Sequence, residues 1–338
     1  IRRVEDIERI VDRPVLAVVP LIRSAKAKES LVPFNIPGRE KVASASRSSD
    51  ANASPGAATT DEDYEVSGVP TDEATIAMLS AIKPSSSVAE SIRSLRTSLN
   101  FATAEGMPQV LMLTSAGMSE GKTTCAINLA TVMAQAGSRV LLIDGDLRKP
   151  RIHKEFGIDK APGVTDQITH FSVDSLSNLP IVETNVEGLS ILPAGSPTPN
   201  PADMLASTRL TRILDEVKQH FDHIIIDASP ILGLADALIL SRQSEGLIFV
   251  TRSAQTGKDN FRMSMKRLAQ VRAPVLGVVL NCVDLDSPEY SYYSAYYYSY
   301  DSDPGDGGDD GNPYDDGPDD DETSPQGLST ARPAGGVA

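Results

Sequence analysis

The chain has no Trp, and aromatic residues of all kinds make up only 5% of its 338 residues. Hydrophobic residues as a whole account for 40% of the sequence, so any large core must be built from aliphatic side chains. Immunoglobulin-like β-sandwiches pack around a buried aromatic residue. An aliphatic core favours an α/β fold instead, in which helices cover a sheet of Val, Ile and Leu.

Cysteine and histidine are scarce as well. Cys125 and Cys282 lie far apart in the sequence and match no metal-ligand or CxxC spacing. The sequence therefore indicates neither a disulfide framework nor a zinc site, and we expect two small buried thiols. The histidines form no ligand cluster either, and we assign a role to none of them. They are His153, His170, His220 and His223.

Long apolar runs are missing. The longest unbroken stretches resemble Val15 to Val19, whereas a membrane-spanning helix needs about 20 apolar residues. A signal segment, with a charged start and an apolar centre, is also absent. Since the chain opens on Ile1 rather than Met, we expect an excised cytoplasmic piece of a longer protein.

A basic excess is lacking too, because the formal net charge is −15. Nucleic-acid-binding proteins present a basic face, so we expect no nucleic-acid partner. Residues 287–338 hold twelve acidic side chains against one basic side chain, Arg332, and also eight of the nine tyrosines. The acidity therefore belongs mainly to one tyrosine-rich segment, and the remainder of the chain is close to neutral.

Composition divides the chain into four parts. Residues 1–23 predict one short helix and one strand and look like a juxtamembrane segment, whereas residues 24–84 are rich in Ser, Ala, Pro, Thr and Gly and predict a low-complexity linker. Residues 85–286 alternate apolar strands with helices and form the principal domain. Residues 287–338 lose all apolar periodicity and predict a disordered acidic, tyrosine-rich tail.

Residues 85–286 carry the periodic patterns of an α/β domain. The first predicted helix has an apolar base and a charged outer stripe, formed respectively by Val88, Ile92, Leu95 and Leu99 and by Glu90, Arg93 and Arg96. The strand candidates that follow are 110–113, 140–143, 189–192, 224–226, 247–250 and 275–280. The helix candidates are 122–135, 202–218, 235–241 and 258–271. Apolar strands separated by helices predict a doubly wound, mostly parallel sheet.

A phosphate-binding loop lies between the strand at 110–113 and the helix at 122–135. It consists of Ala116, Gly117, Met118, Ser119, Glu120, Gly121, Lys122, Thr123 and Thr124. Phosphates need converging backbone N–H groups at a helix N-terminus, a Lys for the β and γ phosphates, and a hydroxyl for Mg²⁺. The loop offers all three, although Ala116 and Ser119 stand where Gly is common. We therefore expect a nucleotide site and a sheet of the P-loop NTPase type.

Two further apolar strands end in carboxylates. The strand at 140–143 runs into Asp144 and Asp146, and the strand at 224–226 runs into Asp227. Ligands of open parallel sheets bind at the carboxyl ends of the strands, the edge that the phosphate loop occupies. A helix cap or a solvated turn would explain each Asp singly, but not their joint order and placement. We therefore expect the three carboxylates to converge on one nucleotide.

Together these motifs resemble the Walker A, A′ and B motifs of bacterial tyrosine kinases, the cytoplasmic partners of polysaccharide co-polymerases. Glu90, Arg93 and Arg96 match the ExxRxxR element of that family, and the crowded tyrosines match its C-terminal phosphorylation cluster. Residues 4–20 resemble the segment that follows the second membrane helix when co-polymerase and kinase share one chain. Eukaryotic kinase signatures such as GxGxxG and HRD are absent.

The resemblance implies a protein-tyrosine autokinase that uses ATP and Mg²⁺. Lys122 would contact the β and γ phosphates, Asp144 would orient or deprotonate the acceptor phenol, and Mg²⁺ would be held by Thr123, Asp146 and Asp227. The catalytic residues would then be Lys122, Asp144, Asp146 and Asp227, with the loop from Ala116 to Thr124 binding the nucleotide. Phosphoryl transfer depends mainly on such positioning and charge neutralisation.

The tail would supply the phosphoacceptors. Its crowded tyrosines have no accompanying apolar pattern, which makes them a poor core and a good set of exposed phenols. They are Tyr290, Tyr292, Tyr293, Tyr296, Tyr297, Tyr298 and Tyr300. Each phosphate adds about −1.5 to −2 charges, so full phosphorylation would drive neighbouring subunits apart.

The resemblance also implies partners and a location. One subunit would offer its tail to the next in a homo-oligomeric ring, with Glu90, Arg93 and Arg96 as contacts. The kinase would regulate exopolysaccharide or capsule polymerisation and export, together with a membrane-embedded co-polymerase segment and a cognate phosphotyrosine phosphatase. It would lie in the cytoplasm at the inner face of the bacterial membrane, tethered by a transmembrane part absent from this chain.

Two other functions stay open at this point. Partitioning or site-determining ATPase switches have a similar body, but they carry an extra Lys early in the phosphate loop, where this chain has Gly117. The second alternative is a non-enzymatic protein, in which the tail is an interaction segment and the nucleotide site is degenerate. The intact Lys122 and Asp227 count against that reading.

Overall fold

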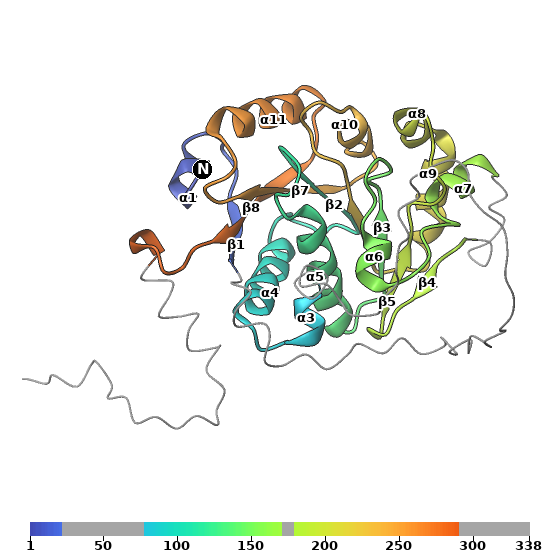
Figure 1. Ribbon diagram of the computed structural model, residues 1–338, viewed down its shortest axis with the longest axis horizontal. Helices are drawn as coiled ribbons and strands as arrows, with labels where there is room; N and C mark the ends of the chain where they lie inside the picture. Colours follow the sequence, from blue (N-terminus) through green and yellow to red (C-terminus); the bar gives the residue numbers. More distant parts are fainter. Residues whose placement is uncertain (22–77, 171–178, 291–338) are drawn as a thin grey trace, which may run out of the picture. The chain divides into compact units, whose positions relative to one another are not determined.

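The computed structural model describes residues 1–21, 78–170 and 179–290, which fall within one compact unit, Ile1–Asp301 (Figure 1). Among these residues the strands are β1 (Val15–Pro20), β2 (Val110–Ser115), β3 (Val140–Asp144), β4 (Val182–Glu183), β5 (Leu189–Leu192), β6 (His223–Asp227), β7 (Gly246–Arg252) and β8 (Val275–Val283). The helices are α1 (Val4–Glu8), α3 (Leu79–Ile82), α4 (Ser87–Asn100), α5 (Lys122–Gln135), α6 (Ile152–Phe156), α7 (Val164–Thr169), α8 (Pro201–Leu205), α9 (Thr208–Val217), α10 (Asp236–Leu240) and α11 (Lys258–Gln270). A 3₁₀ turn, η3 (Pro288–Tyr290), ends the described part.

The strands form one sheet in the order β1-β8-β7-β2-β6-β3-β5-β4. Only β4 runs antiparallel to its neighbour, and every other pair described is parallel. Strands β2 and β3 are buried along their whole length, as parallel strands covered on both faces should be. The predicted doubly wound, mostly parallel fold is confirmed. Its strand order sets the carboxyl ends of β2, β6 and β3 side by side.

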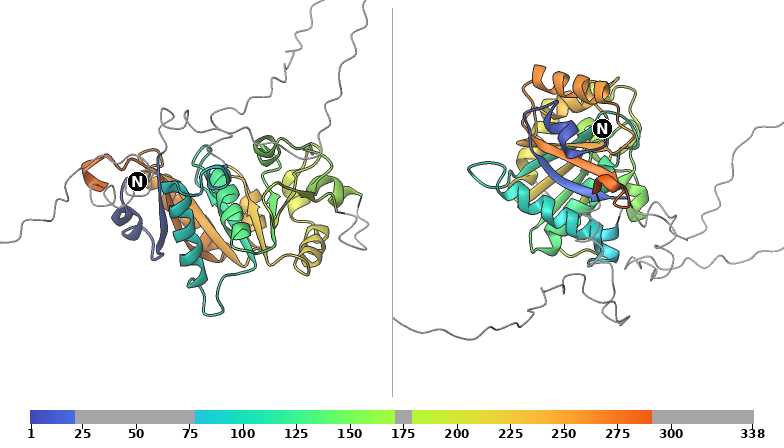
Figure 2. Two further views of the ribbon diagram at one scale, coloured as in Figure 1. Left: turned by 90° about the horizontal axis from the view of Figure 1, so that it is seen from below. Right: turned by 90° about the vertical axis from the view of Figure 1, so that its left-hand side faces the viewer.

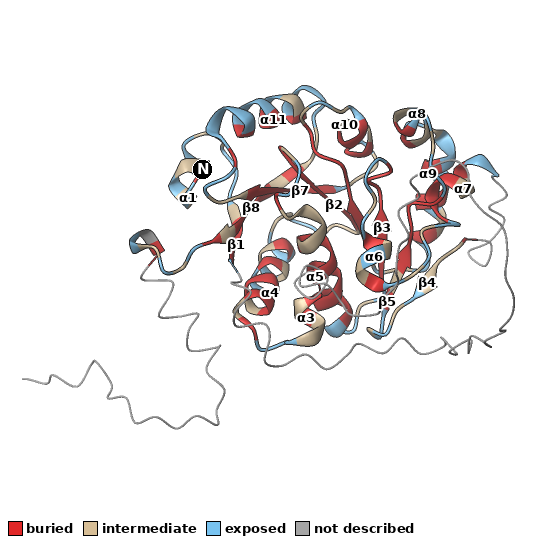
Figure 3. Ribbon diagram, viewed as in Figure 1, coloured by how far each residue is buried: buried red, intermediate tan, exposed pale blue. Residues whose placement is uncertain are grey.

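Helices cover both faces of this sheet, as Figure 2 shows from two further directions. The core under α3, α4 and α5 includes Leu95 and Leu99, both on the predicted apolar base of α4. The core on the other face includes Phe261 of α11, whose ring meets Phe249 of β7 edge-on with centroids 5.4 Å apart. Figure 3 shows that the central strands are buried between these layers. Aliphatic side chains supply most of both cores, as the composition predicts.

The N-terminal segment belongs to the same sheet. β1 pairs in parallel with β8 at the sheet edge, where Val15 lies opposite Val278 and Val18 opposite Leu280. Ile7 of α1 is fully buried in the core. Residues 1–23 are predicted from sequence to lie apart from the principal domain, whereas their described part, residues 1–21, packs against it. An uncovered β8 would leave backbone hydrogen-bonding groups unpaired, and the apolar β1 satisfies them.

The region predicted as one helix over residues 202–218 forms two helices, because Ser207 interrupts it. The Ser207 Oγ accepts a hydrogen bond from the backbone nitrogen of Arg209 at 3.1 Å and so caps α9. Serine is a favoured N-cap because its side chain satisfies an N–H group that the helix leaves unpaired. A single uninterrupted helix was therefore the wrong prediction here.

The end of the predicted linker is ordered. The backbone nitrogen of Ser80, in α3, donates to Oδ1 of Asn128 in α5 at 2.8 Å, and the Ser80 residue is buried. The larger part of the predicted linker, residues 24–77, lies outside the described residues, as does the predicted tail beyond Tyr290. Among the described helices, none combines the length and the apolarity needed to cross a bilayer.

Candidate active site

The phosphate loop connects β2 to α5 at the carboxyl edge of the sheet. Gly121 caps α5 with a φ of 93°, a left-handed conformation that favours glycine. A Cβ atom at this position would lie 1.9 Å from Nδ2 of Asn281, so the loop leaves no space for a side chain. The helix begins at Lys122, and its first unpaired N–H groups and positive dipole end therefore point toward the loop. This arrangement suits a bound phosphate.

Side chains distant in the sequence hold the phosphate loop in place. Oε1 of Glu120 accepts a hydrogen bond from the Thr256 hydroxyl at 2.8 Å, and Oε2 accepts one from the backbone nitrogen of Ala116 at 2.9 Å. Nδ2 of Asn281 donates to the Glu120 carbonyl oxygen at 3.0 Å. Burial raises the pKa of the Glu120 carboxyl, against the opposing effect of these hydrogen bonds. These hydrogen bonds therefore fix the conformation of the phosphate loop.

Sequence reasoning missed both of these supporting residues. Asn281 lies near the carboxyl end of the buried strand β8. A polar residue at the end of an apolar strand is the same signal that identified Asp144 and Asp227, and it could have identified Asn281 as well. Thr256 lies in a short loop after β7 and carries no such signal.

The partly buried Lys122 and Thr123 meet two buried carboxylates in one cluster. The Lys122 Nζ lies 2.9 Å from Oδ2 of Asp146 and 3.5 Å from Oδ1 of Asp227. The Thr123 hydroxyl donates to Oδ2 of Asp227 at 2.6 Å. The side chains of Asp146 and Asp227 are only 7% and 1% exposed, so these charges interact with little screening by water. The residues that were predicted to act together are therefore brought together.

Burial and charge act on this cluster in opposite directions. Burial raises the pKa of Asp227, although the Lys122 ammonium and the Thr123 hydroxyl oppose it. Burial alone would lower the pKa of Lys122, but the carboxylates of Asp227 and Asp146 raise it overall. Lys122 therefore stays cationic at neutral pH, the state required to hold phosphate oxygens.

Asp144 lies beside this cluster and is fully buried. Its Oδ2 accepts hydrogen bonds from the backbone nitrogens of Arg151 and Ile152, both at 3.1 Å. Its Oδ1 is buried and has no hydrogen-bond partner within the described part of the chain. Burial, followed by the nearby Asp227 charge, raises the pKa of Asp144 to about 8. One oxygen of this carboxyl is therefore fixed, and the other is free for a proton or a ligand.

Gly145 lets the ends of β3 and β6 approach each other. Its backbone nitrogen donates to the carbonyl oxygen of Asp227 at 2.8 Å. A Cβ atom here would lie 2.9 Å from Cγ2 of Ile226 and 3.0 Å from that same carbonyl oxygen. The glycine between Asp144 and Asp146 is thus a steric requirement of the site.

The oxygen donors of this cluster suit Mg²⁺, which prefers carboxylates and hydroxyls. Within the described ranges, no three His, Cys, Asp or Glu side chains are grouped as a ready metal centre. Mg²⁺ usually takes one or two carboxylates together with phosphate oxygens and water. The unpartnered Oδ1 of Asp144 is a further hard donor at this edge.

The three residues of the ExxRxxR element lie on α4. Arg93 donates to Oε2 of Glu90 at 2.6 Å and also to the carbonyl oxygen of Pro84. Arg96 donates to the carbonyl oxygen of Val132 in α5 at 3.2 Å. The side chains of Arg93 and Glu90 are 33% and 32% exposed, so the pair remains accessible at the surface, whereas Arg96 also fastens α4 to α5.

Tyr290 differs from the exposed phenol that the sequence predicts. The residue is only 4% exposed and packs with the core, and its hydroxyl donates to the carbonyl oxygen of Arg2 at 3.1 Å. The Tyr290 ring is therefore buried against the apolar core of the domain, whereas the tail sequence that follows it contains few apolar residues. The other six predicted acceptors, from Tyr292 to Tyr300, lie outside the described residues.

A parallel sheet with a phosphate loop after β2 and carboxylates at the ends of β3 and β6 defines a P-loop nucleotide-binding protein. Comparison with known proteins agrees, since a family model described as an AAA domain matches residues 110–273. Tyrosine-protein kinase YwqD of Bacillus subtilis is 35% identical over 217 residues, covering 64% of this chain and 90% of that protein. Tyrosine-protein kinase wzc of Salmonella typhimurium is 34% identical over 226 residues, covering 67% of this chain and 31% of that protein.

Solved structures give the same result. The kinase domain of the Escherichia coli tyrosine kinase ETK matches with a TM-score of 0.66 and 25% identity, covering 85% of this chain and 96% of that one. The chain belongs to the bacterial tyrosine kinases and is a protein-tyrosine kinase. The family resemblance drawn from the motifs is thereby confirmed.

Proposed function

We propose that the chain transfers the γ-phosphoryl group of ATP to tyrosines of its own C-terminal tail, with Mg²⁺ as cofactor. The observation that carries this proposal is the largely buried cluster at one sheet edge. It combines a phosphate loop, a cation, a hydroxyl and carboxylates, and consists of Lys122, Thr123, Asp144, Asp146 and Asp227.

The nucleotide would lie on the loop from Ala116 to Thr124, with its phosphates on the N–H groups at the start of α5. Lys122 would neutralise the β and γ phosphates, and Thr123, Asp146 and Asp227 would hold Mg²⁺. When bound, Mg²⁺ supplies positive charge that stabilises the phosphate oxygens. The fixed conformation of the loop supports this assignment, because phosphoryl transfer relies on positioned charges.

Asp144 would accept the proton of the acceptor phenol. An ordinary Asp has a pKa of about 3.9, some six units below a phenol at about 10. The pKa of Asp144 in the empty site is raised to about 8, so this carboxyl is largely protonated at neutral pH and only its ionised form can accept the phenol proton. For that ionised form the gap to the phenol narrows to roughly two units, which makes it a stronger base than an ordinary Asp. Its unpartnered Oδ1 would receive the proton, while the Arg151 and Ile152 N–H groups hold Oδ2.

The acceptors would be Tyr292, Tyr293, Tyr296, Tyr297, Tyr298 and Tyr300. A subunit would offer this tail to its neighbour in a homo-oligomeric ring, with the accessible Glu90 and Arg93 pair and Arg96 at the contact. Each added phosphate brings about −1.5 to −2 charges, so the modified tails would repel one another and weaken the ring.

In the cell, the kinase would regulate polymerisation and export of an exopolysaccharide or capsule. It would act in the cytoplasm at the inner face of the membrane, with a membrane-embedded co-polymerase segment and a phosphotyrosine phosphatase as partners. A transmembrane part outside this sequence would tether it. The chain spans 31% of the wzc kinase and 90% of YwqD. Residues 24–77 would be a linker, and the residues after Tyr290 the substrate tail.

A mixing experiment tests this function. One chain has an intact site and Phe at the six acceptor tyrosines, and the other carries Lys122→Met with an intact tail. Mg²⁺ and ATP should produce phosphotyrosine on the Lys122→Met chain only when both are present. Lys154→Met, which removes an exposed lysine, is the control and should leave activity unchanged.

Each alternative gives a different result. Phosphotyrosine in wild type but not on the mixed Lys122→Met chain would show transfer within one subunit. ATP hydrolysis without phosphotyrosine would support the partitioning-type switch instead.

A further inference from the structure

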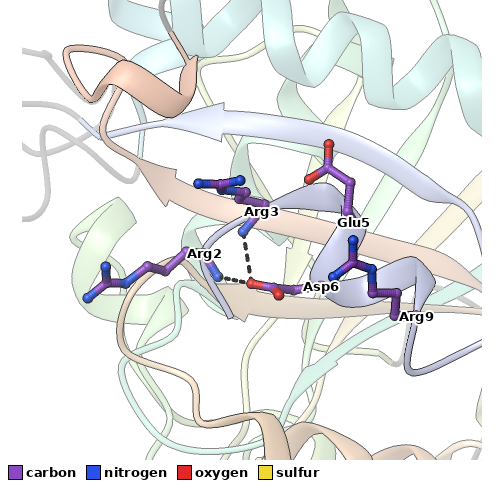
Figure 4. Close-up of a pocket in the computed structure, with 5 residues that line it drawn as sticks. All are labelled: Arg2, Arg3, Glu5, Asp6 and Arg9. Atoms are coloured by element: carbon purple, nitrogen blue, oxygen red, sulfur yellow. Dashed lines mark hydrogen bonds between the residues drawn. The ribbon is translucent and has the colours of Figure 1, made fainter.

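Charged side chains near the start of the chain line a surface pocket of about 260 Å³. Its residues are Arg2, Arg3, Glu5, Asp6 and Arg9 (Figure 4). In that view the guanidinium groups of Arg2, Arg3 and Arg9 point in different directions around Asp6. The described residues that line the pocket all carry charged side chains, so a charged partner fits it better than an apolar one.

The acidic residues of the pocket do not neutralise the positive charges of its arginines. Asp6 accepts hydrogen bonds from the backbone nitrogens of Arg2 and Arg3 at 3.0 and 3.4 Å, and its Oδ1 lies 2.6 Å from Nζ of Lys258. The Lys258 contact holds the pKa of Asp6 well below its usual range, so Asp6 is an anion whose charge Lys258 already balances. Glu5 is the remaining acid of the pocket.

Arg2 and Arg9 are exposed, and neither side chain forms an ion pair with any described acidic residue. An exposed guanidinium offers a planar fork of N–H donors that matches two oxygens of a phosphate. These two arginines therefore provide separate phosphate-binding groups on opposite sides of Asp6 in Figure 4.

The tail starts beside this pocket. The Tyr290 hydroxyl donates to the carbonyl oxygen of Arg2, which fixes the last described residue next to the arginines. An extended chain covers roughly 3.3–3.6 Å per residue. Tyr292, Tyr293 and Tyr296 therefore follow Tyr290 closely enough to reach the pocket of their own subunit.

We propose that this pocket binds the phosphorylated tyrosines of the tail of its own chain. The proposal deepens the function above and rests on it for the origin of the phosphates. Each phosphotyrosine carries about −1.5 to −2 charges, whereas an unmodified phenol carries none. Because the guanidinium groups point in different directions, a segment with several phosphates fits better than a single phosphate. The product tail is then held on its own subunit and withdrawn from the neighbouring active site.

Synthetic peptides test the surface without relying on kinase activity. The peptide spans residues 291–301 and carries phosphate at Tyr292, Tyr293 and Tyr296, and its unphosphorylated form serves as comparison. Binding to the full chain, dephosphorylated beforehand and kept free of nucleotide, is measured by fluorescence anisotropy. Wild type should bind the phosphopeptide saturably. Arg2→Ala/Arg9→Ala should weaken binding and raise the Kd by at least about tenfold.

Matched variants separate this site from general attraction to positive charge. Glu5→Gln removes the remaining acid of the pocket and should tighten binding, whereas Arg13→Ala removes a charge outside it and should change the Kd less than about twofold. The thermal unfolding midpoint of each variant verifies the fold. Equal Kd values for wild type and the double variant, no saturable binding, or equal binding of the unphosphorylated peptide would overturn the proposal. None of these results bears on whether the chain is a kinase, because synthesis supplies the phosphates.

Discussion

Thr256 and Glu120 are joined by a hydrogen bond of 2.8 Å although 136 positions separate them in the sequence. This bond fastens the loop after β7 to the phosphate loop. The carbonyl oxygen of Thr256 also accepts a hydrogen bond from the nitrogen of Ile1 at 2.7 Å. One residue therefore connects the N-terminal segment to the site where phosphate would bind.

Thr256→Val should loosen the phosphate loop, because it keeps the shape of the side chain but removes the hydroxyl that donates to Oε1 of the buried Glu120. We expect a loss of about 1–3 kcal/mol in the free energy of unfolding, and weaker ATP binding. Urea unfolding and nucleotide titration measure the two effects. Thr256→Ser should restore both, and the exposed Thr97→Val should cost under about 0.5 kcal/mol. Unchanged nucleotide binding in Thr256→Val would show that the bond does not shape the loop.

Gly121→Ala and Gly106→Ala form a matched pair. Both glycines have positive φ values, 93° and 94°, but a Cβ at Gly121 meets Asn281 at 1.9 Å whereas one at Gly106 meets nothing within 4 Å. Gly106→Ala should cost about 1 kcal/mol of stability, from backbone strain alone. Gly121→Ala should cost clearly more and abolish nucleotide binding. Equal costs for the two variants would mean that Asn281 moves aside freely.

Asp144 should make the stability of the nucleotide-free protein depend on pH. Its pKa of about 8 in the native state lies above its ordinary value near 3.9, so the native state retains a proton that the unfolded state releases. The free energy of unfolding should therefore fall as pH rises from about 4 to about 8. Asp144→Asn removes this contribution, so its stability relative to wild type should increase across that range.

Chemical unfolding at several pH values, with a chelator present, measures this difference. The control is Asp203→Asn, which changes an exposed carboxyl and should show a difference that does not vary with pH. If the stability difference between Asp144→Asn and wild type also does not vary with pH, then Asp144 is ionised in the empty site and its pKa is not raised.

The Glu90 and Arg93 pair should contribute to assembly of the unphosphorylated protein. Sedimentation of wild type should show a larger species than Glu90→Gln/Arg93→Ala. The matched control removes a similar pair three residues apart on α11, with Asp259→Asn/Arg262→Ala, and should sediment like wild type. Equal masses for wild type and the α4 variant would remove this pair from the contact.

Sequence patterns predicted the strands from β2 to β8 except β4, and most of the site, because both depend on local order along the chain. They did not predict that β1 joins the edge of the same sheet. An apolar run predicts a buried strand. Residues that come after such a run, such as Lys122 and Asp227, must then lie at the carboxyl edge of the sheet. The bond from Thr256 to Glu120 joins distant segments through side chains that carry no periodic signal. The burial of Tyr290 likewise depends on Arg2, 288 positions earlier, so no pattern in the tail indicates it.

The most direct measurement locates phosphate on the chain by mass spectrometry after incubation with Mg²⁺ and ATP. We predict phosphotyrosine between Tyr292 and Tyr300, little at the buried Tyr290, and none in Lys122→Met. Phosphotyrosine that is absent from wild type, or that persists in Lys122→Met, would contradict the proposal that this site phosphorylates its own tail.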